Sequence, residues 1–555
     1  METKPWHTHY DYCVPSTIRY PRLPVHELLQ VPANAYPDNA AIHFMGREIT
    51  FWELRRHVIR IACALGALGI KKGDRVGIHL PTCPQYVISY YAVLSLGAIV
   101  VNLNPLYTTD ELTGTARNTG MTTLITSDMS LSSARALYRT VPIRHVIVTR
   151  VDDYAADNAR GNDAPLDLEK GWHRFLSLLD GASGAGKFRV DIAPEDIAVI
   201  QFTGGTTGIP KGAMLTHANI VAAIFQYTLW MTPLLSLIPP ERRSILIAIP
   251  LYHVYGNLAM NWSILNCILQ IHLPRFQIDE LVHIMEGYRE ITFFPSVPTM
   301  VSALLNHPRI GDLNLGKKLT QLNSGGGPTA PHLIEQMDDM GIFFSQAWGM
   351  SETAGLGTST PVFGAKKINS IGIPYPDTDI RVVDLAEGIN DVPHGEPGEI
   401  IIRGATLMKG YWENPEETAD QIKNGWLHTG DIAVQDEDDF LYIVDRKKDM
   451  IIAGGFNIYP SEIDEVLFTH PKVQFAVAAG IPDAYRGETV KAYIVLKQGM
   501  TATAEEIIAF CREKLAPYKV PRIIEFRAAL PQSSVGKVLR KELRAEEEAK
   551  LKNNQ

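Results

Sequence analysis

Short apolar runs alternate with longer amphipathic stretches along most of the chain. Two of these stretches, residues 53–68 and 278–288, carry apolar positions at helical spacing. The apolar runs have the length of buried strands and lie at residues 76–78, 197–202, 245–249 and 291–294. Strands that are apolar throughout are typical of parallel sheets covered on both faces by helices. The pattern therefore predicts an α/β protein whose large amino-terminal domain, made of several subdomains, holds mostly parallel sheets covered by helices.

One uncharged run, residues 244–274, is long enough to cross a bilayer. A proline and several polar residues interrupt it, namely Pro250, His253, Asn257, Asn261 and Asn266. Lipid would leave such side chains without hydrogen-bond partners. We therefore expect a buried strand followed by a buried helix here, rather than a membrane span.

The end of the chain differs from the rest in charge. Residues 446–555 carry 18 Lys and Arg against 14 Asp and Glu, a net charge of +4, whereas residues 1–445 carry 34 against 47, or −13. The elements expected in this basic part are a helix opened by Ser461 after Pro460, apolar runs at 473–479 and 492–496, and a helix at 504–515. They indicate a second, small α/β domain.

Composition excludes several classes of protein. A chain of 555 residues with 46% hydrophobic and 20% charged residues can form several cores, unlike a disordered or fibrous protein. Its net charge of −9 gives no general attraction to nucleic acid or anionic lipid. The five cysteines show no CxxC spacing, and the first residues lack the basic-then-apolar order of a signal peptide. These features favour a cytoplasmic protein with no nucleic-acid partner.

Residues 153–195 are rich in Asp, Gly and Ala and predict a surface connection. Within them, residues 181–187 satisfy most of the Walker pattern G-x-x-x-x-G-K-[ST]. Phe188, however, stands where that pattern needs a hydroxyl for magnesium. We interpret this stretch as a glycine-rich linker.

A second glycine-rich segment, TGGTTGIPKG at residues 203–212, follows an apolar strand and precedes a helix that Thr216 can cap. Its glycines let backbone N–H groups converge on an anion, its threonine hydroxyls add donors, and Lys211 adds a positive charge. It is not a Walker loop, because Gly212 stands where that loop has its magnesium-binding Ser or Thr. The segment predicts a phosphate-binding site, with a plain glycine turn as the alternative.

The same segment resembles the phosphate-loop signature of the adenylate-forming enzymes, which include acyl- and aryl-CoA ligases, amino-acid adenylation domains and luciferases. Further motifs follow in the order of that family: AWGMSE from Ala347, TGD from Thr429, DRKKD from Asp445 and SVGK from Ser534.

Longer stretches, such as VVNLNPLYTTDEL from Val100 and GFNIYPSEID from Gly455, are similar to bacterial long-chain fatty-acid–CoA ligases, and the similarity spans residues 24–544. The resemblance implies a domain of residues 1–447 that holds the ATP and acyl pocket. It also implies a hinge near Lys448 and a small mobile lid of residues 448–555.

The resemblance also implies roles for individual residues. Lys537 would be the main catalytic group on the lid, Glu352 would hold Mg²⁺, and His253 would lie between the acid and the thiol. The implied ATP-binding residues are Thr203, Gly204, Gly205, Thr206, Thr207, Gly208, Lys211, Gly326, Gly327, Pro328, Ala347, Trp348, Gly349, Ser351, Asp431, Ile443 and Arg446. Taken without the resemblance, Lys537 is a surface lysine, Glu352 a helix cap, Asp431 a turn residue and His253 a core histidine.

Two of these positions carry further expectations. Asp431 would accept hydrogen bonds from both ribose hydroxyls, at the point where a hairpin begins. Trp348 stands where the family usually has tyrosine, so it keeps an aromatic face for adenine but loses the hydroxyl. For the transfer to coenzyme A, the resemblance places Gly454, Gly455 and Phe456 beside the pantetheine tunnel, after a rotation about Lys448. The two glycines have a simpler alternative role as a turn before the Ser461 helix.

Three functions stay open. The first is an ATP-dependent ligase that joins a medium- or long-chain fatty acid to coenzyme A; residues 244–274 hold no acidic residue of the kind that binds an amino acid's amino group. The second is a ligase of the same chemistry for an aryl or cyclic acid, or one that stops at the acyl-adenylate, which a compact closed pocket would favour. The third is a noncatalytic acyl- or nucleotide-binding protein. A homodimer and weak peripheral contact with the inner membrane face are left open.

Overall fold

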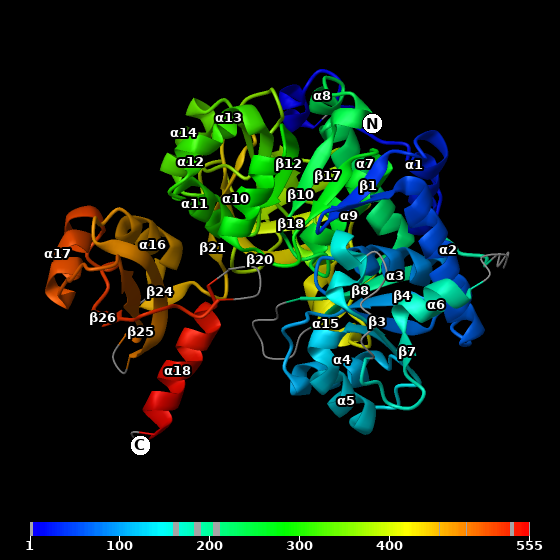
Figure 1. Ribbon diagram of the computed structural model, residues 1–555. Coiled ribbons are helices and arrows are strands. Elements are labelled where there is room, and N and C mark those ends of the chain that lie inside the picture. The colour runs from blue at the N-terminus through cyan, green and yellow to red at the C-terminus, as the bar shows by residue number, and fades with distance from the viewer. Residues whose placement is uncertain are drawn as a thin grey trace. The chain divides into compact units, whose positions relative to one another are not determined.

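The computed structural model describes residues 4–158, 166–182, 190–203, 211–453, 456–483, 486–532 and 538–553 (Figure 1). The chain divides into two compact units. Unit 1 comprises Met1–Asp379 and Arg403–Gly425, and unit 2 comprises Ile380–Ile402 and Trp426–Gln555. The boundary expected near Lys448 stays a prediction.

The larger sheet of unit 1 has nine strands in the order β16-β15-β14-β13-β12-β10-β11-β1-β2. Its strands are β1 (Ala40–Phe44), β2 (Arg47–Thr50), β10 (Ser244–Ile247), β11 (Leu269–His272), β12 (Ile291–Ser296), β13 (Leu319–Ser324), β14 (Phe343–Trp348), β15 (Thr358–Ser359) and β16 (Ile373–Pro374). The neighbours from β14 to β1 are parallel, and β2, β15 and β16 add antiparallel edges.

The second sheet of unit 1 has seven strands in the order β7-β6-β5-β3-β4-β8-β9. They are β3 (Arg75–His79), β4 (Ile99–Asn102), β5 (Thr123–Ser127), β6 (His145–Thr149), β7 (His173–Arg174), β8 (Ile197–Phe202) and β9 (Gly212–Thr216). All pairs are parallel except β8 with β9. The prediction of mostly parallel sheets is confirmed.

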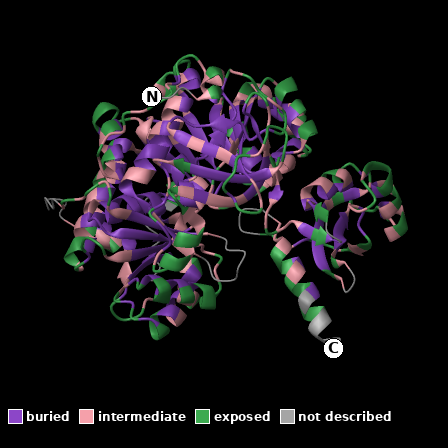
Figure 2. Ribbon diagram, turned by 180° about the vertical axis from the view of Figure 1, so that it is seen from behind, coloured by how far each residue is buried: buried purple, intermediate pink, exposed green. Residues whose placement is uncertain are grey.

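Helices cover these sheets because the apolar face of each helix is buried by packing on a sheet. The α-helices of unit 1 are α1 (Gln30–Ala35), α2 (Phe51–Ala67), α3 (Pro84–Ser95), α4 (Thr109–Thr119), α5 (Leu131–Thr140), α6 (Phe175–Gly181), α7 (His217–Trp230), α8 (Thr232–Leu235), α9 (Val254–Leu265), α10 (Ile278–Gly287), α11 (Pro298–Leu305), α12 (Ile310–Leu313), α13 (Leu315–Lys318), α14 (Pro331–Asp339) and α15 (Pro415–Gln421). Side chains of α10, α11 and α14 pack on the nine-stranded sheet, and those of α4 and α5 on the seven-stranded sheet. Figure 2 shows the strands of these sheets mostly buried.

Two smaller sheets follow. One has the order β17-β18-β20-β19 with β21 paired to β20, and consists of β17 (Thr378–Val383), β18 (Gly398–Gly404), β19 (Ile422–Lys423), β20 (Trp426–Gln435) and β21 (Leu441–Arg446). The other has the order β23-β22-β25-β24 with β26 paired to β25. It consists of β22 (Ile451–Ala453), β23 (Phe456–Ile458), β24 (Val473–Asp483), β25 (Gly487–Leu496) and β26 (Ile523–Phe526). Its helices are α16 (Pro460–Phe468), α17 (Ala504–Lys514) and α18 (Arg540–Asn553).

The uncharged run at residues 244–274 forms β10, the buried helix α9 and a second strand, β11, as expected of a strand and helix in a core. No helix within the described residues is both long and apolar enough to cross a membrane.

The surface connection predicted at residues 153–195 is wrong for its described middle part. Residues 173–181 form the edge strand β7 and helix α6, and the side chains of Trp172, Phe175 and Leu179 are buried. The composition of the segment, dominated by Asp, Gly and Ala, hid these few core positions. Part of the glycine-rich stretch, residues 183–189, lies outside the described residues.

Two predicted helix starts were tested by the structure. Thr216 does cap α7, since its hydroxyl accepts a hydrogen bond from Asn219 N, but the strand β9 stands between the glycine-rich segment and that helix. The helix expected to open at Ser461 instead begins at Pro460, with Tyr459 as the capping residue. Proline fits the first helical position because its missing N–H would have no partner there.

Candidate active site

The ends of the phosphate segment are held together by two strands. Thr203 follows β8 and Lys211 precedes β9, and Thr203 N donates a hydrogen bond to the Lys211 carbonyl (2.9 Å). Five predicted phosphate ligands, Gly204, Gly205, Thr206, Thr207 and Gly208, lie outside the described residues.

Lys211 has an acidic partner far away in sequence. Its ammonium group forms an ion pair with Glu417 on α15 and lies 5.5 Å from the centre of the Tyr411 ring. The lysine side chain is largely covered. An incoming phosphate would therefore either share Lys211 with Glu417 or replace Glu417 as the partner of Lys211.

Glu352 is buried, in the short 3₁₀ turn Ser351–Thr353. Its carboxylate accepts a hydrogen bond from the Tyr411 hydroxyl (2.8 Å). Burial and the nearby Glu352 charge raise the pKa of Tyr411, so the phenol remains a donor at neutral pH. Tyr411 thus stands beside both Glu352 and Lys211.

Glu352 supplies a single carboxylate for the magnesium ion that the resemblance implies. Within the part of the chain that the structure describes, no group of three or more His, Cys, Asp or Glu residues could hold a metal. A cation at Glu352 would take its other ligands from phosphate oxygens and water, as Mg²⁺ commonly does. At this turn the Thr353 hydroxyl accepts a hydrogen bond from Met350 N (3.2 Å), and the helix-cap alternative for Glu352 stays open.

The segments expected around adenine leave the nine-stranded sheet at one edge. Gly326, Gly327 and Pro328 follow β13, while Ala347 and Trp348 end the neighbouring parallel strand β14. Carboxyl ends of parallel strands meet at the same edge, where α/β proteins bind ligands. Glycine is required nearby for two reasons: Gly326 has φ +79°, and a Cβ on Gly349 would collide with the Gly355 carbonyl.

His253 stands before α9 as its N-cap. Its Nδ1 accepts a hydrogen bond from Tyr255 N (3.3 Å), so in the neutral ring the proton is on Nε2. The side chain is half-buried. The structure therefore gives His253 a local capping role, and its role between acid and thiol stays a prediction.

A small cavity of about 10 Å³, room for about one water molecule, lies beside α9 in unit 1. Its described lining residues are Tyr227 on α7; Tyr255, Leu258, Ala259 and Trp262 on α9; Ile245, Phe293 and Pro295 on β10 and β12; and Gln321 and Asn323 on β13. None of them is charged. Trp262 packs edge-to-face against Tyr227 and Phe293, with ring centres 4.9 and 5.0 Å apart.

The polar groups of this cavity bond to one another. The Tyr255 hydroxyl donates to Asn323 Oδ1 (2.5 Å), and the Gln321 and Asn323 amides both donate to Ser345 Oγ (2.8 and 2.7 Å). The wall of the cavity formed by α9 is therefore mainly apolar. The wall formed by β13 carries polar side chains that are hydrogen-bonded.

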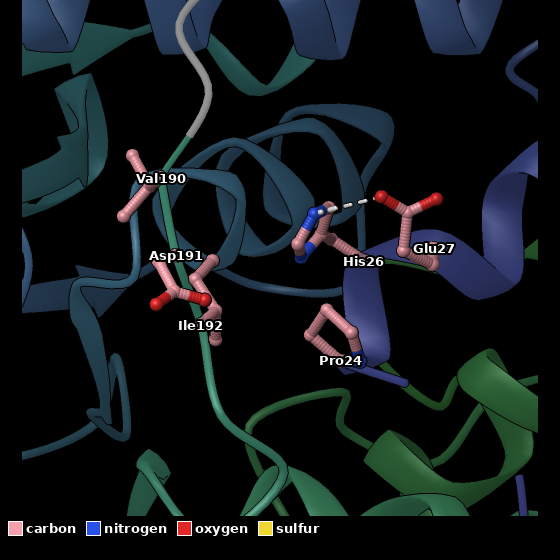
Figure 3. A pocket seen from close by; sticks show the side chains of 6 residues that line it. All are labelled: Pro24, His26, Glu27, Val190, Asp191 and Ile192. Carbon is pink, nitrogen blue, oxygen red and sulfur yellow. Dashed lines mark ion pairs between the residues drawn. The ribbon is translucent and has the colours of Figure 1, made fainter. Parts of the chain in front are cut away.

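A second, more open hollow lies elsewhere in unit 1 (Figure 3). Pro24, His26, Glu27 and residues 190–192 line it, and His26 Nε2 lies 3.4 Å from the Glu27 carboxylate. No residue predicted for the site lies there.

In unit 2, three predicted nucleotide contacts share one hairpin. Asp431 pairs with Arg446 across β20 and β21, and Arg446 Nε lies 3.2 Å from the Asp431 carboxylate. Ile443 on β21 is exposed on one third of its surface. Asp431 stands where a hairpin begins, as expected: its pair with Arg446 is the first of the β20–β21 pairing, and the turn follows at residues 436–440.

The hinge and thiol segments are described in part. Lys448 is exposed in the turn after β21. The Phe456 ring is half-exposed and stacks on Tyr518, with centres 4.6 Å apart. Gly454, Gly455 and the predicted catalytic Lys537 lie outside the described residues.

Two family models match parts of this chain. The model of the AMP-binding enzyme family matches residues 29–412, and that of the AMP-binding enzyme C-terminal domain matches residues 462–537. The chain belongs to the AMP-binding enzyme family.

Named relatives cover almost the whole chain. A long-chain-fatty-acid–CoA ligase of Bacillus subtilis is 40% identical over 557 residues, 98% of each chain, and one of Escherichia coli O6:H1 is 37% identical over 576 residues, 99% of each. Among solved structures, the O-succinylbenzoate coenzyme A synthetase MenE of Bacillus subtilis, in complex with ATP and magnesium ion, matches with a TM-score of 0.78 and 28% identity, over 94% of this chain and all of that one. The resemblance to adenylate-forming enzymes and the α/β fold class are thereby confirmed.

Within this AMP-binding enzyme, several partners were not predicted from the sequence. Glu417 pairs with Lys211, Tyr411 with Glu352, and the buried Glu399 with Lys447, at separations of 206, 59 and 48 residues. No local pattern marks such pairs, since only the fold brings them together.

Proposed function

We propose that this AMP-forming acid–thiol ligase is an acyl-CoA ligase that activates a medium- or long-chain fatty acid. The carboxylate would attack the α-phosphorus of ATP, forming acyl-adenylate and releasing pyrophosphate. The thiol sulfur of coenzyme A would then attack the acyl carbon, so that AMP leaves and the thiol proton passes to solvent.

The cavity beside α9 carries this proposal. It is lined mostly by aromatic and aliphatic side chains, and the Tyr255, Gln321 and Asn323 side chains along it are hydrogen-bonded. A hydrocarbon tail would gain free energy here once side chains move apart to make room for it, whereas an amino group would find no carboxylate among the lining residues. The names of the full-length relatives support the same substrate class.

In the first half-reaction the protein would act mainly by placing charge. Lys537 would offset the repulsion between the carboxylate and the α-phosphate, and Lys211 would contact the outer phosphates. Magnesium, held through Glu352, would neutralise phosphate charge. Asp431 would accept the ribose hydroxyls, with Arg446 beside it.

In the second half-reaction the lid would rotate about Lys448. Lys537 would leave the site, and Gly454, Gly455 and Phe456 would border the path of the pantetheine arm. Adenine would lie between Gly326–Pro328 and Trp348. Cytoplasmic location, peripheral membrane contact and dimerisation stay predictions.

A ring acid is the second candidate, and one observation favours it. The cavity is small, and the rings of Tyr227, Trp262 and Phe293 form part of its wall. A small pocket with aromatic walls favours an aryl or cyclic acid over a long chain, and the MenE neighbour is named for O-succinylbenzoate.

Measured release of AMP and pyrophosphate would test the proposal. The panel would hold short, medium and long straight-chain acids, benzoate and amino acids, each with and without coenzyme A. A peak on a straight-chain acid that needs coenzyme A supports the fatty-acid ligase. A peak on benzoate, or turnover without coenzyme A, supports the second candidate, and silence across the panel would refute both.

A further inference from the structure

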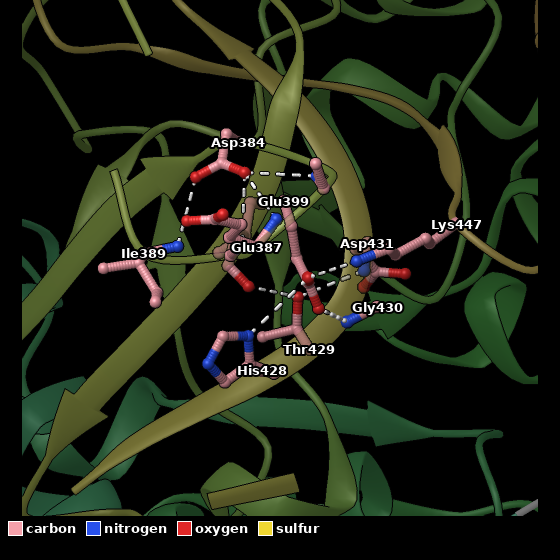
Figure 4. Close-up of polar contacts among 12 residues, drawn as sticks. Asp384, Glu387, Ile389, Glu399, His428, Thr429, Gly430, Asp431 and Lys447 are labelled. Atoms are coloured by element: carbon pink, nitrogen blue, oxygen red, sulfur yellow. Dashed lines mark hydrogen bonds and ion pairs between the residues drawn. The ribbon is translucent and has the colours of Figure 1, made fainter. Parts of the chain in front are cut away.

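The carboxylate of Glu399 sits at the centre of a polar network on β18 and β20 (Figure 4). Its side chain is only 5% exposed. Oε1 accepts a hydrogen bond from Gly430 N (3.1 Å), Oε2 accepts one from Lys447 Nζ (3.1 Å), and His428 Nδ1 lies 3.6 Å away. Burying a carboxylate costs free energy unless hydrogen-bond donors and positive charges surround it. The network therefore restricts the positions of Gly430 and Lys447.

One arm of the network reaches the predicted ribose ligand. Gly430, held by Glu399, directly precedes Asp431 and has φ +71°, a left-handed conformation that glycine adopts without strain. Thr429 adds a second hold, since its hydroxyl donates to the Ile400 carbonyl (2.7 Å) and accepts from Asp431 N (3.1 Å). The backbone at Asp431 is thus fixed to β18 from two sides.

The other arm reaches the residue before the predicted hinge. Lys447 N donates to the Gly430 carbonyl (2.8 Å), in addition to the side-chain bond to Glu399. Beyond the hinge, the Lys448 carbonyl accepts a hydrogen bond from Arg544 of α18 (2.8 Å), and Arg544 also pairs with Glu488 (2.6 Å). Lys448 therefore stands between two anchored groups.

We propose that Glu399 is a positioning residue that fixes both Asp431 and Lys447 to β18, so that the ribose carboxylate keeps its place when the chain rotates at Lys448. The inference rests on the proposed function, which supplies the roles of Asp431 and Lys448. Because Arg544 holds the Lys448 carbonyl on the far side, rotation is confined to the backbone torsions of Lys448 itself.

Binding of ATP and of 2′-deoxy-ATP, measured by calorimetry without any acid, tests the ribose arm. Wild type should prefer ATP by about tenfold, a typical effect of a hydrogen bond to a charged group. In Glu399→Ala the preference should fall to about twofold, because Gly430 and hence Asp431 lose their hold. A folded Glu399→Ala protein that keeps the tenfold preference overturns the proposal, as does equal binding by wild type.

The hinge arm needs variants that spare Gly430. Glu399→Gln keeps an acceptor for Gly430 N but loses the charge that holds Lys447, and Lys447→Met removes the lysine. Both should keep the ATP preference, while thioester formation from supplied acyl-adenylate should fall severalfold. Unchanged transfer in both overturns the proposal, and these two variants decide it if Glu399→Ala does not fold.

A matched control separates this effect from general loss of an ion pair. Lys472 pairs with Glu506 (2.7 Å) away from the network, so Lys472→Met should change neither measurement. The ATP-binding arm needs no acid, so it reports on Glu399 even if no acid is turned over. Failure of the acid panel with an intact ribose preference would refute the proposed function alone.

Discussion

The cavity beside α9 and the network around Glu399 are built from opposite kinds of side chain. None of the residues lining the cavity is charged, and the polar side chains of Tyr255, Gln321 and Asn323 are hydrogen-bonded within β13, β14 and α9. Around Glu399, charged side chains from distant positions meet: Lys447 lies 3.1 Å from the Glu399 carboxylate, and Arg446 lies 3.2 Å from that of Asp431. Under the proposed function, this difference means that the protein would select its acid by shape and apolar burial, and would handle the nucleotide by charge and hydrogen bonds.

If this division holds, changes of charge should affect nucleotide chemistry strongly and acid choice little. Changes of cavity shape should do the opposite.

The largest effect is expected at Lys537. Lys537→Ala should lower acyl-adenylate formation by about a thousandfold or more, because a charge aimed at the transition state is lost in a site that offers no substitute. Transfer from supplied acyl-adenylate to coenzyme A should continue at close to the wild-type rate. Pyrophosphate release and thioester formation, measured separately, check this; equal losses in both steps would remove the assigned role.

The next effect tests how poorly the nine-stranded sheet accepts charge. His272 on β11 is fully buried, bonds Gln270 (2.8 Å) through Nε2, and has a pKa that burial lowers to about 3. Since the unfolded chain takes up this proton near pH 6.5, the stability that depends on neutral His272 is lost as pH falls below 6.5. At pH 4 the loss should be about 3 kcal/mol.

Thermal unfolding between pH 7 and pH 4 measures this loss. His272→Gln keeps an amide donor near Gln270 but cannot take up the proton, so it should unfold less steeply with acid than wild type. An identical acid dependence in the two proteins would show that the sheet tolerates the charge.

A smaller effect is expected at Asp431. Asp431→Asn removes the negative charge that Arg446 faces at 3.2 Å and weakens acceptance of the ribose hydroxyls. ATP affinity should fall about tenfold, and the ranking of acids should stay as in wild type. Titration with ATP and a repeated acid panel check both statements; a changed ranking of acids would break the division between the two regions.

Much of the fold could be predicted from local pattern. The run at 197–202 is β8, the stretch at 278–288 contains α10, and the helix at 504–515 contains α17, because each is defined by residues a few positions apart. Prediction failed at residues 172–181, where three buried side chains, Trp172, Phe175 and Leu179, decide the structure within a segment rich in Asp, Gly and Ala.

Less of the site could be predicted from the sequence. The motifs identified Lys211, Glu352 and Asp431, but not the side chains that contact them or their neighbours. Glu417, Tyr411 and Glu399 lie far from their partners in sequence, and only the completed fold brings them together, without any signal in their own surroundings.

The smallest effect concerns the shape of the cavity. Trp262 is fully buried on α9 and lines the cavity together with Tyr227 and Phe293. Trp262→Phe should lengthen the space for the acid, so that the preferred acid gains about one methylene. Burial of one methylene contributes about 0.8 kcal/mol, or roughly fourfold in kcat/KM relative to the shorter acid.

Trp230 on α7 provides the matched control for this substitution. It is equally buried but lies outside the cavity lining, with its ring N–H donating to the Thr360 carbonyl (3.2 Å). Trp230→Phe should lower stability without moving the optimum chain length, and neither variant should change the affinity for ATP. If the Trp262 variant keeps the wild-type optimum while the protein remains folded, the cavity is not where the acid binds, and the contrast between the two regions loses its functional meaning.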